Sequence, residues 1–262
     1  MTNVGSRGAG LRSFRLDGAV ALVTGASAGL GAAMAVALAE AGADVAAHGN
    51  TRSPAATCAR IQAVGRRTAL LRGDLSDRAV SDRLVGETIA ALGGIDILIN
   101  NAGTIRRAPA SEVADEDWDQ VIETNLTSAF RLARAAARHM LASGRGGKII
   151  NVASLLAFQG GITVPAYAAA KGGLAQLTKA LANEWAPQGI NVNAIAPGYM
   201  ETTNTSALRA DPIRSRQILE RITAGRWGVP DDVAGAAVYL ASPAASYVHG
   251  HLLVVDGGWL GR

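Results

Sequence analysis

Short apolar runs alternate with longer helical stretches along almost the whole chain of 262 residues, and this alternation constrains the fold more than any other feature. Seven runs are expected to be strands, at residues 19–25, 44–49, 68–75, 94–103, 147–154, 189–198 and 251–258. The stretches between them are rich in Ala and Leu and have the length of helices. Apolar strands separated by helices predict an α/β fold, a doubly wound, Rossmann-type parallel sheet of seven strands with helices on both faces.

No linker or low-complexity stretch divides the chain, so we expect a single dinucleotide-binding catalytic domain over residues 15–262. Residues 1–14 are small, basic and polar, and we interpret them as a flexible N-terminal tail that lacks the apolar centre of a signal peptide. Doubly wound sheets bind ligands beyond the carboxyl ends of their strands. The irregular segment near 199–225 follows the sixth strand and is therefore a candidate lid over a substrate.

Composition excludes several classes of function. No apolar run is long enough to span a bilayer, so no membrane partner is expected. The net charge is +4, but the basic residues are scattered and aromatic residues make up only 4%, which argues against nucleic-acid binding. Cys58 is the single cysteine, which excludes an internal disulfide and favours the cytoplasm. The four histidines lack metal-ligand spacing, so no metal is expected.

A glycine-rich stretch, "VTGASAGLGAAM" at 23–34, follows the first expected strand and opens the first helix. Glycine permits a tight turn, lets the backbone approach a pyrophosphate and directs a helix N-terminus at its charge. A plain turn is the alternative, but the position after the first strand favours a dinucleotide site. The candidate residues in this stretch are Gly25, Ser27, Gly29, Leu30 and Gly31.

The residues after the second and third strands are candidates for the adenosine end of such a site. Asp74, followed by Leu75, can accept a hydrogen bond from an adenine amino group or can cap the helix that begins near Ser76. After the second strand, an acidic residue would bind the ribose hydroxyl of NAD, and an arginine would bind the 2′-phosphate of NADP. The stretch after that strand has no acidic residue and contains Arg52, so the residues leave the choice open.

Polar residues that could carry proton transfer follow in the second half of the chain. Tyr167 and Lys171 stand four apart in an expected helix, so the phenol and the ammonium share one face. A nearby cation favours the phenolate and would lower the pKa of Tyr167 toward neutrality, making it a general base. Ser154 ends the fifth strand and could hold a substrate oxygen. Asn125 lies in an expected buried helix, where it is a satisfied core amide or the anchor of a water.

The motifs "TGASAGLG", "NNAG", "YAAAK" and "PG", together with Asn125 and Ser154, occur in the order and at the spacings of a short-chain dehydrogenase/reductase, and the resemblance covers residues 14–262. It implies a catalytic tetrad of Asn125, Ser154, Tyr167 and Lys171, with Ser154 and Tyr167 on the substrate. It further implies coenzyme contacts, beyond those already given, at Asn101, Ala102, Gly103, Tyr167, Lys171, Pro197, Gly198 and Thr202.

Longer stretches, among them "IRRAP", "NVASLLAFQGGITVPAYAAAKGG" and "VDGGWLGR", resemble the members of this family that act on keto-deoxy sugar acids, and also those that act on gluconate. That resemblance implies hydride transfer between a nicotinamide coenzyme and a secondary alcohol or ketone of a sugar acid. It also implies NAD as cofactor, with NADP possible, and a homotetramer of D₂ symmetry. The alternatives are a 3-oxoacyl-carrier-protein reductase, for which no compact basic patch is evident, and a nucleotide-binding regulator that has lost its chemistry.

Two arginines, Arg106 and Arg107, follow the fourth expected strand and emerge on the coenzyme side of the sheet. A guanidinium fork matches the carboxylate of a sugar acid. One of the two arginines is therefore a candidate for holding the substrate carboxylate. The alternative is a pair of solvated arginines on a loop, because charged loop residues are usually exposed.

Overall fold

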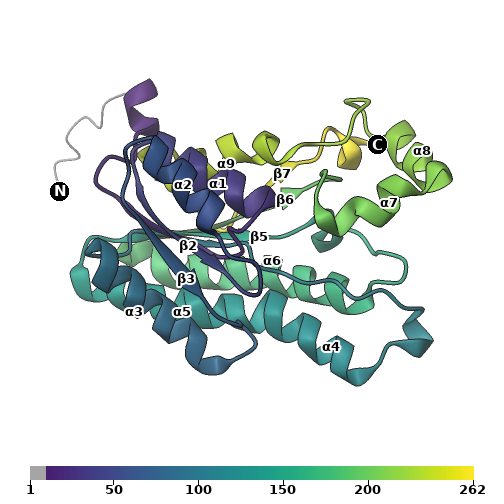
Figure 1. Cartoon of the computed structure of the whole chain (residues 1–262), viewed down its shortest axis with the longest axis horizontal. Helices are drawn as coiled ribbons and strands as arrows, with labels where there is room; N and C mark the ends of the chain where they lie inside the picture. The colour runs from purple at the N-terminus through teal and green to yellow at the C-terminus, as the bar shows by residue number, and fades with distance from the viewer. Residues whose placement is uncertain (1–9) are drawn as a thin grey trace.

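The computed structural model describes residues 10–262 and contains one seven-stranded sheet in the order β3-β2-β1-β4-β5-β6-β7, in which every neighbouring pair is parallel (Figure 1). The strands are β1 (Val20–Val23), β2 (Asp44–Gly49), β3 (Thr68–Arg72), β4 (Ile97–Asn100), β5 (Gly147–Val152), β6 (Ile190–Pro197) and β7 (Leu252–Val255). Each lies within a range expected from the sequence, and the doubly wound fold is confirmed.

Helices cover both faces of the sheet, with α1, α2 and α9 on one face and α3, α5 and α6 on the other (Figure 1). The helices are α1 (Gly29–Glu40), α2 (Ala55–Ala63), α3 (Arg78–Leu92), α4 (Asp115–Ile122), α5 (Ser128–Ser143), α6 (Pro165–Trp185), α7 (Ser206–Ala210), α8 (Pro212–Arg221) and α9 (Ala234–Ala241). The sequence of the central strand β1 is continuously apolar because both faces of the strand are covered by helices. Ala21 and Val23 pack into the core beneath one helical layer, and Val20 and Leu22 into the core beneath the other.

The strand order reverses between β1 and β4, and this point positions the site. Strands β2 and β3 extend the sheet on one side of β1, and β5, β6 and β7 extend it beyond β4 on the other. The loops after β1 and β4 must therefore diverge into opposite helical layers, which opens a crevice at the carboxyl ends of these strands. The Thr24 N–H donates to the Ile99 carbonyl at 3.0 Å and holds the two loops together at their origin.

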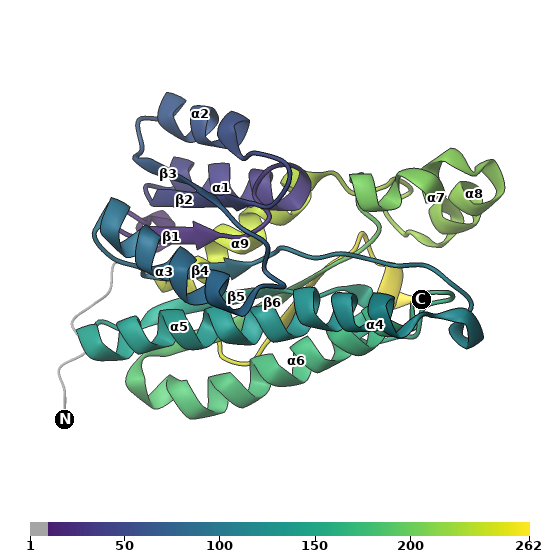
Figure 2. The same ribbon diagram turned by 60° about the horizontal axis from the view of Figure 1, so that its bottom comes forward.

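The segment 199–225, called the lid segment below, contains the 3₁₀ turn Thr203–Thr205 and helices α7 and α8. Figure 2 shows α7 and α8 extending away from the body of the sheet and its helical layers. The base of the segment is closed by a bridge between Met200 and Gly228. An irregular stretch was expected here, and the structure instead forms helices, because Asp211 caps α8 through the N–H groups of Ile213 and Arg214.

Most of the expected N-terminal tail, residues 1–14, lies outside the described residues. Its last residues form a 3₁₀ turn, Leu11–Phe14, and the Phe14 ring lies 6.1 Å from that of Tyr239. Within residues 10–262, no helix has both the length and the apolar character that crossing a bilayer requires.

Candidate active site

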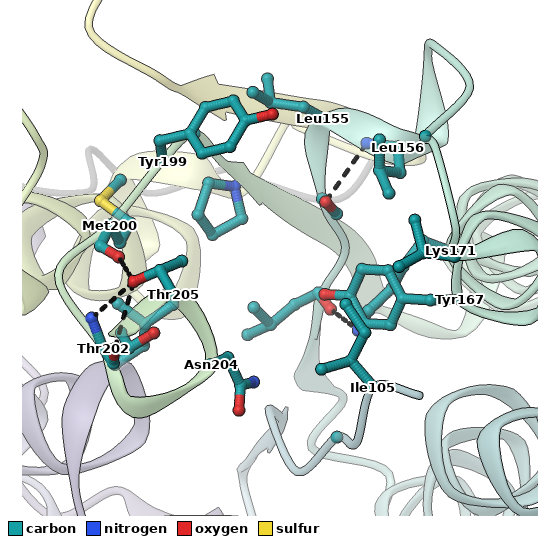
Figure 3. Close-up of a pocket in the computed structure, with 18 of the residues that line it drawn as sticks. Ile105, Leu155, Leu156, Tyr167, Lys171, Tyr199, Met200, Thr202, Asn204 and Thr205 are labelled. Carbon is teal, nitrogen blue, oxygen red and sulfur yellow. Dashed lines mark hydrogen bonds between the residues drawn. The ribbon is translucent and has the colours of Figure 1, made fainter. Parts of the chain in front are cut away.

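A cavity of about 810 Å³ lies at the carboxyl ends of β1, β4, β5 and β6. It is lined by residues of the glycine-rich loop, the loop after β4, the first half of α6 and the lid segment. Figure 3 shows Tyr167 and Lys171 on one side of this cavity, and Tyr199, Met200, Thr202 and Asn204 on the other. The cavity therefore brings together segments from Gly25 to Trp259 that lie far apart in the sequence, as expected at a switch point of a doubly wound sheet.

The glycine-rich loop has a backbone that only glycine supports. Gly25 and Gly29 have φ values of 64° and 55°, in the left-handed region. A Cβ on Gly25 would lie 2.9 Å from Ala102 Cα, and a Cβ on Gly31 would overlap the carbonyl oxygen of Gly25. The loop is thus packed tightly between the start of α1 and the loop after β4, and its cavity-facing backbone fits the pyrophosphate of a dinucleotide.

Asn101 holds the loop after β4 against the glycine-rich loop. Its Nδ2 donates to the carbonyl oxygens of Thr24 at 2.9 Å and Gly25 at 3.1 Å. The N–H groups of Asn101 and Ala102 both donate to Thr24 Oγ1 at 3.0 Å. Side-chain hydrogen bonds thus fix the two loops that border the coenzyme side of the cavity.

Asn125 lies in a five-residue π-turn, Glu123–Thr127, between α4 and α5 rather than within a regular helix as expected. Its side chain is 1% exposed, and Nδ2 donates to the carbonyl oxygens of Thr104 and Val121, each at 2.8 Å. The Oδ1 atom has no hydrogen-bond partner. It faces Gly103, where a Cβ would lie 2.6 Å from it. The Asn125 amide nitrogen thus has hydrogen-bond partners in the protein, whereas its oxygen, which lies beside the cavity, has none.

Ser154, Tyr167 and Lys171 converge in the cavity, as the sequence predicts. Ser154 follows β5, and its Oγ accepts a hydrogen bond from the Leu156 N–H at 3.2 Å. Tyr167 and Lys171 lie in the first two turns of α6, which Pro165 begins. The Lys171 side chain is 3% exposed, and its Nζ donates to the Val152 carbonyl at 2.6 Å.

The expected effect of Lys171 on the Tyr167 pKa is wrong for this structure. Burial raises the pKa of Tyr167, and this outweighs the lowering by a hydrogen bond with Ser154 and by the charge of Arg107. Lys171 Nζ lies 5.5 Å from the centre of the Tyr167 ring and is bound to Val152 instead of the phenol oxygen. Burial also lowers the pKa of Lys171 to about 8, which weakens its charge. Tyr167 is therefore a neutral phenol, suited to donate a proton.

The expected adenosine-end residues lie beside the cavity rather than in its wall. Ser27 Oγ donates to the Arg52 carbonyl at 2.7 Å and ties the glycine-rich loop to the turn after β2. The carboxylate of Asp74 accepts from the N–H and the hydroxyl of Ser76 in the turn before α3. These bonds lower the pKa of Asp74. The N-cap of α3 is Asp77, so Asp74 does not cap this helix, contrary to the alternative interpretation. Leu75 packs in the core, and Arg52 is exposed.

The structure separates the two adjacent arginines. Arg106 points away from the cavity and contacts α4, where its Nε donates to Asp117 at 3.1 Å and its Nη2 to Gln120 at 2.8 Å. Arg107 lines the cavity, and its Nη2 donates to the carbonyl of Asn204 in the lid segment at 3.2 Å. Only Arg107 of this pair can reach a ligand beside Tyr167.

The remaining expected coenzyme residues, which follow β4 or lie at and after the end of β6, all line the cavity: Asn101, Ala102, Gly103, Pro197, Gly198 and Thr202. Among the lining residues that the sequence analysis missed are Gln159, Arg214, Arg221 and Trp259. The Cys/His/Asp/Glu side chains of residues 10–262 form no group of three that could hold a metal.

The comparisons with known proteins agree with this geometry. A family described as enoyl-(acyl carrier protein) reductase matches residues 25–260. The chain is 52% identical to the 2-dehydro-3-deoxy-D-gluconate 5-dehydrogenase of Dickeya dadantii over 96% of this chain and 99% of that protein.

Two solved structures are similar over nearly the whole fold. A candidate 2-deoxy-D-gluconate 3-dehydrogenase from Agrobacterium tumefaciens with bound NADP is 55% identical with a TM-score of 0.90, over 95% of this chain and 99% of that one. A gluconate 5-dehydrogenase from Burkholderia cenocepacia, in complex with NADP and tartrate, is 41% identical with a TM-score of 0.90, over 96% and 98% of the two chains. The chain belongs to the short-chain dehydrogenase/reductase family of nicotinamide-dependent oxidoreductases.

Proposed function

We propose that this enzyme transfers a hydride between a nicotinamide coenzyme and C5 of 2-dehydro-3-deoxy-D-gluconate. One observation carries the proposal. The cavity beside Tyr167 is lined by four cationic side chains and, within residues 10–262, by no carboxylate; the four are Arg107, Lys171, Arg214 and Arg221. Such a cavity favours an anionic substrate. The Dickeya relative, at 52% identity, supports this particular sugar acid. The gluconate 5-dehydrogenase from Burkholderia supports gluconate as a second substrate.

The coenzyme, when bound, supplies the hydride acceptor or donor, and the protein manages the proton and the oxygen. We assign proton exchange with the substrate oxygen to Tyr167 and a hydrogen bond to the same oxygen to Ser154. In ketone reduction, the neutral phenol gives its proton to the oxygen as hydride arrives. In alcohol oxidation, the phenolate must take that proton, so oxidation is expected to speed up as pH rises. Burial, which raises the pKa of Tyr167, keeps the phenol protonated near neutral pH, the form that gives its proton in reduction.

Lys171 and Asn125 support the proton path in this proposal. Lys171 is held by the Val152 carbonyl at 2.6 Å, and its lowered pKa lets it give up a proton more readily than an exposed lysine. Asn125 Oδ1 is buried and free of protein donors, so it can accept a hydrogen bond from a water that leads to Lys171. Asn125 is therefore a positioning residue for the relay.

We further propose that the coenzyme site accepts NADP as well as NAD. A side chain at Gly49, at the end of β2, would overlap Ser27 Oγ, so the carboxylate that would bind the NAD ribose has no room there. Asn50, Thr51 and Arg52 follow, and none of them would repel a 2′-phosphate. The bound NADP in the two similar structures agrees with this choice.

The experiment that tests the reaction is a panel of keto-deoxy sugar acids, gluconate and an acyl-thioester ketone, each with NAD(H) and NADP(H). We expect the sugar acids to be turned over and the thioester to be inert. Tyr167→Phe should lower kcat by about 10²–10⁴-fold, the usual contribution of a general acid or base, while coenzyme binding is retained. Near-normal turnover by Tyr167→Phe, or activity confined to the thioester, would overturn the proposal.

We propose that Arg107 binds the substrate carboxylate, since its guanidinium lines the cavity while Arg106 is bound to Asp117. Arg107→Ala should lower kcat/KM for the acid. The fall should correspond to a loss of about 1.5–3 kcal/mol in transition-state stabilisation, the value of a hydrogen bond to a charged group. The loss should be much smaller for the methyl ester of the same acid. Arg106→Ala is the matched control and should change neither value. Equal losses on acid and ester would show that Arg107 acts on the fold rather than on the carboxylate.

A further inference from the structure

The placing of Tyr167 and Lys171 beside Ser154 depends on how helix α6 is held relative to strand β5. Tyr167 and Lys171 belong to α6, whereas Ser154 follows the last residue of β5 by two positions. The Lys171 Nζ donates to the Val152 carbonyl at the end of β5, which is one polar contact between the two elements. A shift of α6 along β5 would therefore move Tyr167 and Lys171 together, away from Ser154.

A second polar contact joins the same two elements away from the cavity. The Asn151 Nδ2 of β5 donates to the hydroxyl of Thr178 on α6 at 2.9 Å. That hydroxyl in turn donates to the Leu174 carbonyl, one turn earlier on the helix, at 2.8 Å. Asn151 is 1% exposed and Thr178 is 0% exposed. The hydroxyl thus accepts one hydrogen bond and donates another where water does not reach, and an unpaired polar group there costs free energy.

The Asn151 amide is also fixed from its other side. Its Oδ1 accepts a hydrogen bond from the Asn100 Nδ2 of β4 at 2.9 Å, so Nδ2 is the atom of Asn151 that faces α6. The Asn100 Nδ2 also donates to the Ala129 carbonyl of α5 at 3.1 Å, and Ala129 follows Asn125 by four residues. The hydrogen bonds therefore run from α5 through β4 and β5 to α6, and reach each element that carries or borders a member of the expected tetrad.

Thr178 follows Lys171 by seven residues, so the two side chains lie about two turns apart on one face of α6. We propose that Thr178 is a positioning residue for the reaction, because its hydrogen bond with Asn151 sets the position of α6 relative to β5. That position keeps Tyr167 and Lys171 beside Ser154. This inference rests on the proposed function in its assignment of proton exchange to Tyr167.

The test removes the Thr178 hydroxyl and keeps the size of the side chain. Thr178→Val leaves the buried Asn151 Nδ2 without its acceptor, so α6 is expected to shift. A reacting group displaced by about 1 Å can cost about 10²-fold in rate, and we expect kcat for the best substrate of the panel to fall by about 10- to 100-fold. The Kd of NADP, which the glycine-rich loop helps to hold, should change much less. Thr178→Ser keeps the hydroxyl and should retain most of kcat.

Thr88→Val is the matched control. Thr88 is also 0% exposed in a helix, α3, and its hydroxyl donates to the Leu84 carbonyl one turn earlier at 2.7 Å. Helix α3 contributes none of the described residues that line the cavity. Thr88→Val should therefore leave kcat unchanged. An equal fall of kcat in Thr88→Val and Thr178→Val would overturn the inference, because the loss would then follow from removing any buried hydroxyl.

A second measurement needs no turnover. Burial lowers the pKa of Lys171 to about 8, and the chain contains only two other lysines, Lys148 and Lys179, so its titration can be followed by NMR of ¹³C-labelled lysine. A shifted α6 would admit water to Lys171, so this pKa should rise toward that of an exposed lysine in Thr178→Val and stay unchanged in Thr178→Ser.

The two measurements separate this inference from the proposed function. Unchanged kcat and an unchanged Lys171 pKa in Thr178→Val would overturn this inference alone. A raised Lys171 pKa in Thr178→Val would support it even if every substrate of the panel proved inert. Normal turnover by Tyr167→Phe, together with a loss of kcat in Thr178→Val, would reject the proton assignment and keep the positioning role of Thr178.

Discussion

His48 shows how one buried ring can connect three segments. It is 1% exposed at the end of β2; its Nδ1 accepts from the Gly25 N–H at 3.4 Å, and its Nε2 lies 3.0 Å from the Gly73 carbonyl. This arrangement requires the neutral ring with hydrogen on Nε2. Burial lowers the pKa of His48, and the charge of Arg83 lowers it further. The hydrogen bond with the Gly73 carbonyl and the charge of Asp74 act in the opposite direction. The glycine-rich loop therefore depends on a histidine that must stay uncharged.

The lowered pKa of His48 predicts acid sensitivity of the fold. In the unfolded chain the ring takes up a proton near its ordinary pKa of 6.5, but in the folded protein only at lower pH. Its contribution to stability is therefore complete above that pKa and is lost as pH falls below it. We expect the melting temperature of the native protein to fall more steeply from about pH 7 to pH 5 than that of His48→Gln. His251→Gln, at an exposed position, should follow the native curve. Parallel curves for His48→Gln and the native protein would contradict this.

At the scale of elements, helix α1 and the glycine-rich loop form one rigid unit. A Cβ on Gly31 would overlap the Gly25 carbonyl, and backbone cannot move aside as a flexible side chain can. Gly31→Ala should therefore displace the loop, weaken NADPH binding measured by fluorescence, and lower the free energy of unfolding by about 1–3 kcal/mol.

The matched control for Gly31→Ala is Gly86→Ala on α3, where a Cβ meets nothing within 4 Å. That variant should be neutral or stabilising by up to about 1 kcal/mol, as expected for replacing glycine inside a helix. Urea unfolding measures both changes. A Gly31→Ala protein that behaves like Gly86→Ala would show that the loop tolerates displacement.

The sequence predicts the elements that depend on a pattern of neighbouring residues, and it misses the features that depend on contacts between distant segments. The seven strands follow from continuous apolar runs, and the site at their carboxyl ends follows from strand order. The π-turn around Asn125 was missed because its extra residue depends on packing between helices. Arg106 and Arg107 are equivalent in sequence, and they differ only because Asp117, eleven positions later, lies beside one of them. The pKa of Tyr167 depends on burial and on Val152, which holds Lys171, and neither is visible in the motif.

At the scale of the whole molecule, strand β7 is one of the two edge strands of the sheet and is only half-buried. Tyr247, shortly before it, is 98% exposed, which is unusual for a large aromatic side chain. Edge strands are commonly covered in the native assembly. We therefore keep the prediction of a homotetramer of D₂ symmetry, in which a second copy covers this edge.

Light scattering at micromolar concentration should give a mass near four times 26.8 kDa. Tyr247→Ser should shift the protein toward smaller species, whereas Tyr239→Ser, at a half-buried position on α9, should not. A native protein that stays monomeric at these concentrations would refute the assembly.

The last residues are bonded to the base of the lid segment. Arg262 Nη1 donates to the Glu220 carbonyl at 2.9 Å, Thr223 Oγ1 to Gly258 at 3.0 Å, and the Ala224 N–H to Gly257 at 2.8 Å. Anything joined after Arg262, such as a purification tag, would start beside the end of α8 and close to the cavity. A tag placed there would lie against the lid segment, whereas a tag placed before β1 would start at the amino ends of the strands, opposite the cavity.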